Sequence, residues 1–429
     1  MLRTSPTYRA LVRLAVRLVP LLRRSVKVAA GHRGRLGAAA RLAVWAAAER
    51  DATRPLLWCH APSVGEGLQA EAVLKILRAR HPHWQIAYTY FSPSALPLAA
   101  RQPADVREYL PYDRPADVAS ALDALAPTAL VFTKLDLWPE LAVQARHRGV
   151  RVGMIAGTVS PVSSRLRWPA RALTRPGYRA LESVGAIAAD DAGRLAELGV
   201  DPSRITITGD PRFDSALAAT RSAPNDSRLG EVGRGAPTLI AGSTWPADEA
   251  ALLSAFVTVR ARHPEARLVL VPHEPTTIHL TGIDLLAASF RLPPAVRFST
   301  MSEASPLIVV DQVGLLAALY RSGTIAFVGG GFGRAGLHSV IEPAASGLPV
   351  VFGPEWRSSR EAGLLLEGAG ALVAQSAEAL AAVWTRWLED PVSREQAATR
   401  ASAVVAAGLG AAERNARLVE LLIAAGISR

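Results

Sequence analysis

Residues 56–80 read LLWCHAPSVGEGLQAEAVLKILRAR, and this stretch decides the fold class. The short apolar run at 56–60 predicts a buried strand, and a loop at 61–67 separates it from a helical pattern of apolar residues. The same alternation of strand and helix continues along most of the chain. Alternating strands and helices predict parallel sheets with helices on both faces, which is an α/β fold.

Ten strands are expected, in two series. The first series is Leu56–His60, Gln85–Tyr90, Ala129–Thr133, Val150–Ala156 and Ile205–Thr208, and the second is Thr238–Ala241, Leu268–Val271, Leu307–Val310, Thr324–Val328 and Pro349–Phe352. A Gly/Pro/Ser-rich stretch at about 222–237 separates them. Two such series predict two doubly wound, Rossmann-like domains with a cleft between them. We therefore expect a basic, apolar segment at 1–50, a first domain at 51–222 and a second at 223–429.

The composition limits what kind of protein this is. Of the 429 residues, 50% are hydrophobic, which suits a packed core rather than a disordered chain. A single cysteine, Cys59, excludes a disulfide framework and a cysteine-rich metal site. The formal net charge is +11, but residues 1–60 hold 12 Lys/Arg against 2 Asp/Glu, so the remainder is nearly neutral. A protein that coats nucleic acid is therefore not expected.

The N-terminal segment combines an apolar stretch with regularly spaced arginines. Arg9, Arg13 and Arg17 recur every four residues and would share one face of a helix. The apolar stretch is interrupted by charge, which argues against a spanning helix, and no small-residue cleavage site follows it. We expect a helix in the membrane interface, with its arginines on anionic headgroups. The alternative is an ordinary amphipathic helix that covers the body.

The loops that follow strands are where chemistry is expected, because ligands of open α/β sheets bind at the carboxyl ends of strands. After the first strand, Ser63 or Gly65 would lie near a helix N-terminus, with Glu66 in its first turn. The helix end stabilises a carboxylate there as an anion, and such a group can act as base for a substrate hydroxyl. Simple capping of the helix is the alternative.

Two further loops of the first domain carry cationic side chains. Lys134, after the third strand, could meet an anionic substrate group, or could form a surface ion pair with Asp136. Arg212, near the end of the first series, suits a carboxylate or a phosphate because its guanidinium binds in a bidentate way. The alternative is an ion pair with Asp210 or Asp214.

The second domain offers candidate groups for a phosphate and a ribose. The turn at 242–244 could cradle either of them, and His273 could contact a phosphate. The glycine-rich loop at 329–333 would let backbone N–H groups approach an anion closely. His338 could donate to a phosphate, and Glu342, one turn further on, could accept from ribose hydroxyls.

Residues 331–336 also match the GxGxxG pattern of dinucleotide-binding proteins. That fingerprint belongs to the first strand–helix unit of its domain, whereas this match falls late in the second domain, so nicotinamide binding is not expected. The chain has no Asp-x-Asp motif at a predicted strand end, and no metal is expected.

In their order along the chain, these loops resemble the 3-deoxy-D-manno-octulosonic acid (Kdo) transferases, which add Kdo to lipid A precursors. The motifs that carry the resemblance are Gly31-His-Arg-Gly34, His60-Ala-Pro-Ser63-Val64-Gly65-Glu66, Leu110-Pro-Tyr-Asp113, Leu137-Trp-Pro139, Gly209-Asp-Pro-Arg212-Phe213-Asp214, Gly242-Ser-Thr244, Phe327-Val-Gly-Gly330, His338 and Glu342-Pro-Ala344. The resemblance implies a GT-B fold, with two Rossmann-like domains facing a cleft, and CMP-Kdo as donor substrate without a cofactor.

The resemblance also implies roles for individual residues. Glu66 matches the general base of the family, and Arg212 stands where a lysine stabilises the transition state. Positions for CMP binding are Ser243, Thr244, Pro272, His273, Val313, Gly314, Leu315, Gly330, Gly331, His338, Ser339, Val340, Ile341 and Glu342. Ser63, Gly65 and Asp136 are expected on the acceptor side.

Three positions depart from the family pattern. Lys134 stands where a glutamate usually has a transition-state role, so the charge is reversed there, and the lysine could pair with the Kdo carboxylate or an acceptor phosphate. Leu315 replaces a glutamate, and His273 replaces an arginine. We interpret these departures as divergence within the family rather than loss of activity.

The sequence thus predicts an inverting Kdo transferase on the cytoplasmic face of the inner membrane. Glu66 would deprotonate an acceptor hydroxyl, and CMP would leave with its phosphate held by the 329–333 loop, the helix near His338, and Arg212. The expected partners are CMP-Kdo, a lipid A precursor and the membrane surface. A GT-B transferase with another nucleotide sugar, or a non-catalytic nucleotide or lipid binder, remains the alternative.

Overall fold

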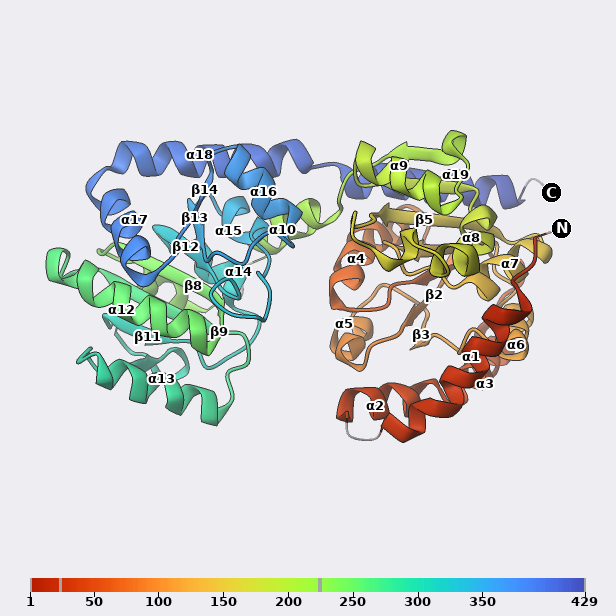
Figure 1. Ribbon diagram of the computed structural model, residues 1–429, viewed down its shortest axis with the longest axis horizontal. Helices are drawn as coiled ribbons and strands as arrows, with labels where there is room; N and C mark the ends of the chain where they lie inside the picture. Colours follow the sequence, from red (N-terminus) through yellow and green to blue (C-terminus); the bar gives the residue numbers. More distant parts are fainter. Residues whose placement is uncertain (1, 23–24, 223–225, 304, 428–429) are drawn as a thin grey trace. The chain divides into compact units, whose positions relative to one another are not determined.

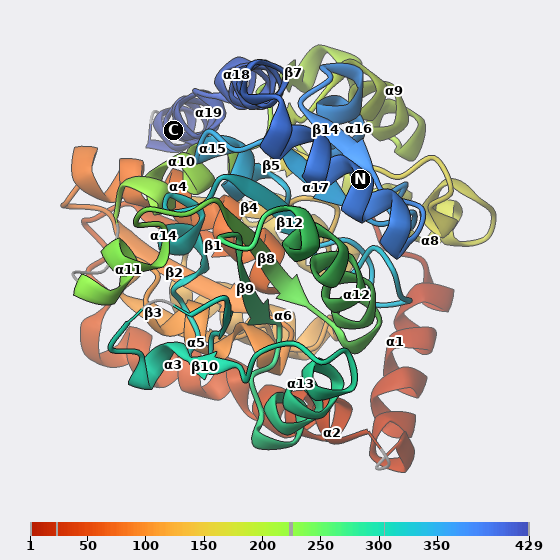
Figure 2. The same ribbon diagram turned by 90° about the vertical axis from the view of Figure 1, so that its left-hand side faces the viewer.

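The chain folds into two compact units, each built around one parallel sheet. The computed structural model describes residues 2–22, 25–222, 226–303 and 305–427. The first unit runs to Ser215 and takes up the chain again from Leu409, and the second comprises Ala216–Gly408. Each unit has a seven-stranded sheet in which all neighbouring strands pair in parallel, with helices on both faces (Figures 1 and 2). The predicted α/β class is confirmed.

The first sheet has the strand order β3-β2-β1-β4-β5-β6-β7. Its strands are β1 (Leu56–His60), β2 (Gln85–Tyr90), β3 (Val106–Tyr109), β4 (Ala129–Thr133), β5 (Arg151–Gly157), β6 (Ser183–Ala186) and β7 (Ile205–Ile207). The helices of this unit are α1 (Pro6–Leu18), α2 (Val26–Arg35), α3 (Ala38–Glu49), α4 (Val64–Arg80), α5 (Leu96–Ala100), α6 (Pro115–Leu125), α7 (Pro139–His147), α8 (Ala170–Ala180), α9 (Ala189–Leu198) and α19 (Ala411–Ile427), and α10 (Arg212–Arg221) leads into the second unit. Residues of α3 and α6–α9 form the core on one face, and residues of α4 and α19 form it on the other.

The second sheet has the strand order β10-β11-β9-β8-β12-β13-β14. Its strands are β8 (Thr238–Thr244), β9 (Arg267–Pro272), β10 (Val296–Arg297), β11 (Leu307–Val309), β12 (Ile325–Val328), β13 (Val350–Phe352) and β14 (Ala371–Val373). The helices are α11 (Ser227–Val232), α12 (Pro246–Arg262), α13 (Thr277–Ser289), α14 (Leu316–Tyr320), α15 (Ile341–Ala345), α16 (Arg360–Glu367), α17 (Ala377–Glu389) and α18 (Pro391–Gly408). One core joins α12, α13 and α17, and the other joins α11 and α14.

All ten predicted strands are present, with ends shifted by at most a few residues, but four strands were missed. These are β3, β6, β10 and β14. β3 (VREY) carries two charges, β6 (SVGA) is short and made mostly of small residues, and β10 has only two residues. None of them presents the longer apolar run from which strands were predicted.

The structure corrects the expected domain boundaries. The first unit ends at Ser215 rather than near 222, and the C-terminal helix α19 belongs to the first unit rather than the second. The physical reason is the apolar face of α19, where Ala416, Val419 and Ile423 are fully or almost fully buried against α4 and the strands beside it. Asn415, on the same helix, is also fully buried and accepts from Thr208 Oγ1 at 3.1 Å.

Helix α1 is fixed to the first unit through polar side chains. Arg9 makes two contacts with the buried carboxylate of Glu140, Nε–Oε2 at 2.9 Å and Nη2–Oε1 at 3.0 Å, and Tyr8 donates to Asp113 Oδ2 at 2.6 Å. Arg9 therefore faces protein, which corrects the expectation that all three arginines of this face lie on headgroups. Among the described residues, no helix is both long enough and apolar enough to cross a bilayer.

Replacing Asn415 should destabilise the first unit. Its Oδ1 accepts from Thr208 Oγ1 and from the Ala156 N–H, and both donors would lose this buried acceptor in Asn415→Ala. We expect the free energy of unfolding, measured by urea denaturation, to fall by about 1–3 kcal/mol. Arg417→Ala, at an exposed position of the same helix, should change it by less than about 0.5 kcal/mol. Equal effects of the two substitutions would contradict the anchoring role of Asn415.

Candidate active site

Each sheet contains one point where the strand order reverses, between β1 and β4 in the first unit and between β8 and β12 in the second. Loops that leave the carboxyl ends of the two strands at such a point diverge to opposite sides, and the resulting crevice is where open α/β sheets bind ligands. Ser63 and Glu66 follow β1, and Lys134 follows β4 directly. The strongest chemical candidates of the first domain therefore lie at its switch point.

Glu66 is held as an anion by two neighbours. Lys134 Nζ lies 2.9 Å from Glu66 Oε1, and the Ser63 hydroxyl donates to Glu66 Oε2. Burial alone would raise the pKa of the Glu66 carboxyl, but the Lys134 ammonium and the Ser63 hydroxyl outweigh burial, so the pKa lies below its ordinary value. With 13% of its side chain exposed, Glu66 is an ionised carboxylate that a small group can still reach.

Lys134 pairs with Glu66 and not with Asp136, which corrects the alternative of a local surface ion pair. The lysine backbone has φ +64°, in the left-handed region, and its N–H donates to Ile155 O at 2.8 Å. The side chain remains 41% exposed, so the ammonium could contact an anion as well as Glu66. Pairing of Lys134 with a substrate group stays a prediction.

The Asp136 carboxylate contacts three side chains of the protein. His60 Nε2 lies 3.2 Å from Asp136 Oδ2, the Trp138 indole donates to the same oxygen at 3.1 Å, and Arg165 lies 3.5 Å from Oδ1. Burial would raise the pKa of Asp136, but His60 and Arg165 hold it below its ordinary value. Because an ionised carboxylate only accepts, His60 carries a proton on Nε2 and donates it to Asp136. The buried His60 is thus a part of the site that its motif alone did not assign.

Arg212 is bound to Asp210, as one of the two sequence interpretations expected. Its Nε and Nη2 lie 2.9 Å and 2.6 Å from Asp210 Oδ2. Gln69, three residues after Glu66 on α4, donates to the other oxygen of Asp210 at 2.9 Å. Burial would raise the pKa of Asp210, but Arg212 keeps it below the ordinary value. Asp214 instead accepts from backbone N–H groups of Gly410 and Ala412, at 2.8 Å each.

In the second unit, a buried carboxylate occupies part of the glycine-rich loop. Asp248 on α12 accepts from the N–H groups of Gly330 at 2.7 Å, Phe332 at 3.0 Å and Trp245 at 3.0 Å. The Gly330 N–H thus donates to Asp248, which corrects the expectation that this N–H is free to bind an anion. The loop needs its glycines for a different reason, since a Cβ at Gly329 would overlap the carbonyl of Ser243.

Three aromatic rings gather beside this loop. Trp245 Nε1 donates to His338 Nε2 at 2.8 Å, and the His273 ring stacks on both, with centroid distances of 4.3 Å to His338 and 4.9 Å to Trp245. Burial, with the nearby His273, lowers the pKa of His338 to about 4, so His338 is neutral at physiological pH. His273 and His338, each predicted as a donor contact, therefore lie together, and Trp245 and Asp248, which lie beside them, were missed. Asp248 is three residues after Trp245 at the start of α12, a capping pattern that could have indicated it.

The other predicted donor residues divide by exposure. Five of these residues have buried side chains, so they could offer only their backbone groups to a ligand. They are Thr244, Pro272, Leu315, Val340 and Ile341. Val313 and Ser339 are exposed, and Ser243 and Gly314 have positive φ values of 54° and 87°. Thr244 donates to Glu249 Oε1 at 2.8 Å.

Three predicted positions remain, and they are Glu342, Gly331 and Gly65. Burial raises the pKa of the Glu342 carboxyl, which has no hydrogen-bond partner among the described residues. Gly331 packs against Gly353, where a Cβ would have no room. Gly65 lies exposed in the first turn of α4, where a Cβ would meet nothing within 4 Å.

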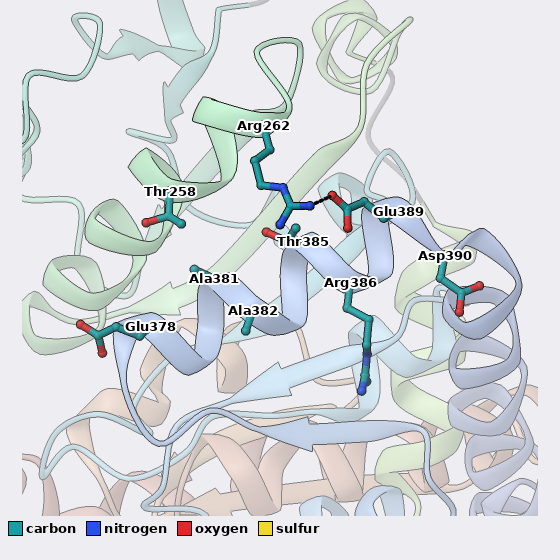
Figure 3. A pocket seen from close by; sticks show the side chains of 9 residues that line it. All are labelled: Thr258, Arg262, Glu378, Ala381, Ala382, Thr385, Arg386, Glu389 and Asp390. Atoms are coloured by element: carbon teal, nitrogen blue, oxygen red, sulfur yellow. Dashed lines mark ion pairs between the residues drawn. The ribbon is translucent and has the colours of Figure 1, made fainter.

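A separate hollow of about 510 Å³ lies between α12 and α17. Figure 3 shows its lining, in which Arg262 of α12 reaches Glu389 of α17; the ion pair is 2.6 Å long. This hollow lies between two helices, away from the strand ends, and its Arg262–Glu389 pair is satisfied internally. It therefore adds no chemistry to the site.

Comparison with known proteins agrees with the order of motifs. Residues 33–215 match the model of the family described as 3-deoxy-D-manno-octulosonic-acid transferase (kdotransferase). The chain is 29% identical to the 3-deoxy-D-manno-octulosonic acid transferase of Bordetella pertussis, over 85% of this chain and 86% of the relative. It is 26% identical to that of Haemophilus influenzae, with the same coverage of both chains. The chain is thus similar to the Kdo transferases over most of its length. Four aligned curated relatives from chlamydial species carry the same description.

Solved structures with the same architecture support the fold of this Kdo transferase relative. UDP-GlcNAc 2-epimerase of Neisseria meningitidis bound to UDP-GlcNAc has a TM-score of 0.59 at 12% identity, covering 83% of this chain and 99% of that one. Another UDP-N-acetylglucosamine 2-epimerase has a TM-score of 0.60 at 13% identity, covering 87% and 96%. At this identity the likeness shows the fold alone, which is a two-unit α/β architecture of the GT-B type.

Removing the Lys134 ammonium should raise the pKa of Glu66. In Lys134→Met, burial of the carboxyl is no longer outweighed by the neighbouring positive charge. The pKa of Glu66, followed by carboxyl ¹³C NMR during a pH titration, should shift upward from the wild-type value. Lys75→Met is the matched control, because Lys75 also lies near α4 acids but pairs with Glu71. An unchanged pKa of Glu66 in Lys134→Met would contradict the role given to this pair.

Proposed function

We propose that the protein transfers Kdo from CMP-Kdo to a lipid A precursor, with inversion at the anomeric carbon. The observation that carries the proposal is the ionised Glu66 at the β1–β4 switch point, inside the segment that matches the Kdo transferase family model. The curated relatives, matched over most of this chain, are named for this activity. Two of the three departures from the family pattern, Lys134 and Leu315, are accommodated by the fold, since Lys134 pairs with Glu66 and Leu315 is in the core.

In this proposal the first unit supplies the base. The Glu66 carboxylate accepts a proton from the acceptor hydroxyl as that oxygen attacks the anomeric carbon of the donor. Ser63 and Lys134 hold the carboxylate in place, and Asp136, fixed by His60, offers a second oxygen at which a sugar hydroxyl could donate. Arg212, bound to Asp210 and one-third exposed, is the candidate to offset charge that develops on the leaving phosphate.

The second unit holds the nucleotide in this proposal. His338 is neutral and can donate to the phosphate, and Glu342, with no partner among the described residues, can accept from ribose hydroxyls. His273 stacks on His338 at the position where the family carries an arginine. No cofactor takes part, and the chemistry uses side chains and backbone groups of this chain.

We also propose that α1 lies on the cytoplasmic surface of the inner membrane. Leu11, Leu14 and Leu18 are 48%, 53% and 45% exposed on α1, although they are large apolar side chains. Arg13 and Arg17 line a cavity of about 460 Å³ beside α6, together with Arg114. Exposed leucines beside arginines that have no acidic partner among the described residues fit an interfacial helix that meets both acyl chains and anionic headgroups.

Removing the base should abolish most of the turnover. Glu66→Gln keeps the shape of the side chain but cannot accept a proton, and general-base catalysis contributes roughly 100- to 10,000-fold. We expect acceptor-dependent CMP release from CMP-Kdo and lipid A precursor to fall by that factor, while CMP binding is retained. Glu71→Gln, on the next turns of the same helix, should retain activity. Near-normal turnover in Glu66→Gln would contradict the assignment of Glu66.

Donor specificity separates the proposal from its alternatives. With lipid A precursor present, CMP-Kdo should be consumed and UDP-sugars should not. Consumption of a UDP-sugar alone would favour a GT-B transferase with another donor. No acceptor-dependent release from any donor, in a protein that binds CMP, would favour a non-catalytic nucleotide binder.

Membrane binding should depend on Arg13 and Arg17. A basic residue near an anionic surface contributes about 1 kcal/mol, so Arg13→Gln/Arg17→Gln should weaken binding to phosphatidylglycerol-containing vesicles by roughly 30-fold. Arg321→Gln/Arg400→Gln removes the same charge from exposed positions of the second unit and is the matched control. Co-sedimentation with vesicles measures both. Equal loss in the two double variants would show that net charge, rather than α1, determines binding.

A further inference from the structure

We infer that Trp245 is a positioning residue of the donor site, whose indole N–H fixes His338 in the tautomer that presents Nδ1–H to an anionic oxygen of the donor. Neither the motifs nor the comparisons assign Trp245. The inference rests on the proposed function for the identity of the ligand, but the tautomer itself follows from the geometry of the second unit alone.

The direction of the Trp245–His338 hydrogen bond sets the tautomer. The two nitrogens, Trp245 Nε1 and His338 Nε2, are 2.8 Å apart. An indole nitrogen can only donate, so His338 Nε2 must be the acceptor and carries no proton. A neutral imidazole has one proton, and it therefore resides on Nδ1. Nδ1–H has no hydrogen-bond partner among the described residues, so it is a donor available to a ligand.

The surrounding contacts keep the histidine ring in one orientation. The His338 N–H donates to Gly329 O at 3.1 Å, which ties the residue to the end of β12. The His273 ring stacks on the His338 ring at 4.3 Å with an angle of 29° between their planes. The planes of the Trp245 indole and the imidazole are nearly parallel, at an angle of 12°. Rotation of the imidazole would break both the stacking and the indole hydrogen bond.

One buried carboxylate fixes both partners of this hydrogen bond. Asp248 Oδ2 accepts from the Trp245 N–H at 3.0 Å and from the Gly330 N–H at 2.7 Å. It thereby joins the loop that carries the indole to the loop that carries the imidazole. The loops follow β8 and β12, the two strands at the switch point of this sheet. Such outer contacts determine which nitrogen of a functional histidine faces the ligand.

Three titratable groups lie on the elements that neighbour His338: His273 in the loop after β9, Asp248 on α12 and Glu342 on α15. Of these, His273 stacks on the imidazole and can itself donate to an anion. The two carboxyl groups accept when ionised, and Asp248 is already engaged by three backbone N–H groups. A neutral His338 with Nδ1–H outward therefore provides a directed donor without a full positive charge.

The tautomer can be tested in the full-length protein without any donor. The chain has 9 histidines, and ¹⁵N-histidine labelling with His338→Gln for assignment isolates the His338 signals. Wild-type protein should show a protonated Nδ1 and an unprotonated Nε2. Trp245→Phe keeps an aromatic ring but removes the donor, and its His338 nitrogens should move towards averaged values. Trp168→Phe, at a position 84% exposed in the first unit, should leave the signals unchanged.

The link to the ligand is tested by CMP titration in a double-mutant cycle. Trp245→Phe should weaken CMP binding about 2- to 10-fold, the range for one hydrogen bond. In the His338→Ala background, the same substitution should have almost no further effect, because Trp245 acts through His338. An additive effect, or a protonated Nε2 in the wild-type spectrum, would overturn the inference. If wild-type protein does not bind CMP, the proposed function fails and so does the ligand assigned to Nδ1, whereas the spectrum alone decides the tautomer.

Discussion

The parallel pairing of β1 with β4 is the constraint on which the Glu66–Lys134 ion pair depends. His60 of β1 lies opposite Phe132 of β4, so the two chains leave the sheet at nearly the same level. Lys134 leaves β4 through a left-handed backbone conformation, and Glu66 lies in the first turn of the helix that follows β1. These two directions bring an ammonium and a carboxylate to 2.9 Å across 68 residues of sequence. Without the pairing of these strands, the ammonium and the carboxylate would not meet.

The second unit has the same parallel pairing at its switch point, but its buried carboxylate is stabilised in a different way. Its switch-point strands β8 and β12 also pair in parallel, but the buried carboxylate there, Asp248, is satisfied by three backbone N–H groups rather than by a cation. Burial raises the pKa of Asp248, and these hydrogen bonds oppose that rise. An unpaired carboxylate at this depth would cost several kcal/mol. Glu66 is therefore balanced by a cation and remains partly exposed, whereas Asp248 holds loops together through backbone hydrogen bonds.

The sequence was sufficient for ten of the fourteen strands of the described residues and for the loops that follow them, because apolar runs and loop residues are local signals. It was not sufficient for features that depend on distant partners. The placement of α19 in the first unit follows from an apolar face that packs against α4, β4, β5 and β6, which lie far earlier in the sequence. The hydrogen bond from the Gly330 N–H to Asp248 joins residues that are 82 positions apart. The ion pair between Arg9 and Glu140 joins residues that are 131 positions apart. A glycine-rich loop indicates close approach of the backbone, but not whether a ligand or a side chain approaches it.

The reversed charge at position 134 has two opposing effects on Glu66. The Lys134 ammonium increases the ionised fraction of Glu66 but also makes the carboxylate a weaker base, since it lowers the pKa. The two effects need not act at the same moment, because Lys134 is 41% exposed while Glu66 is only 13% exposed. An anionic substrate group that drew the ammonium away would leave the carboxylate buried without its counter-charge, and burial would then raise its pKa. A lysine at this position thus keeps the Glu66 carboxylate ionised while the two side chains are paired, and the basicity of that carboxylate would rise if an anion drew the ammonium away.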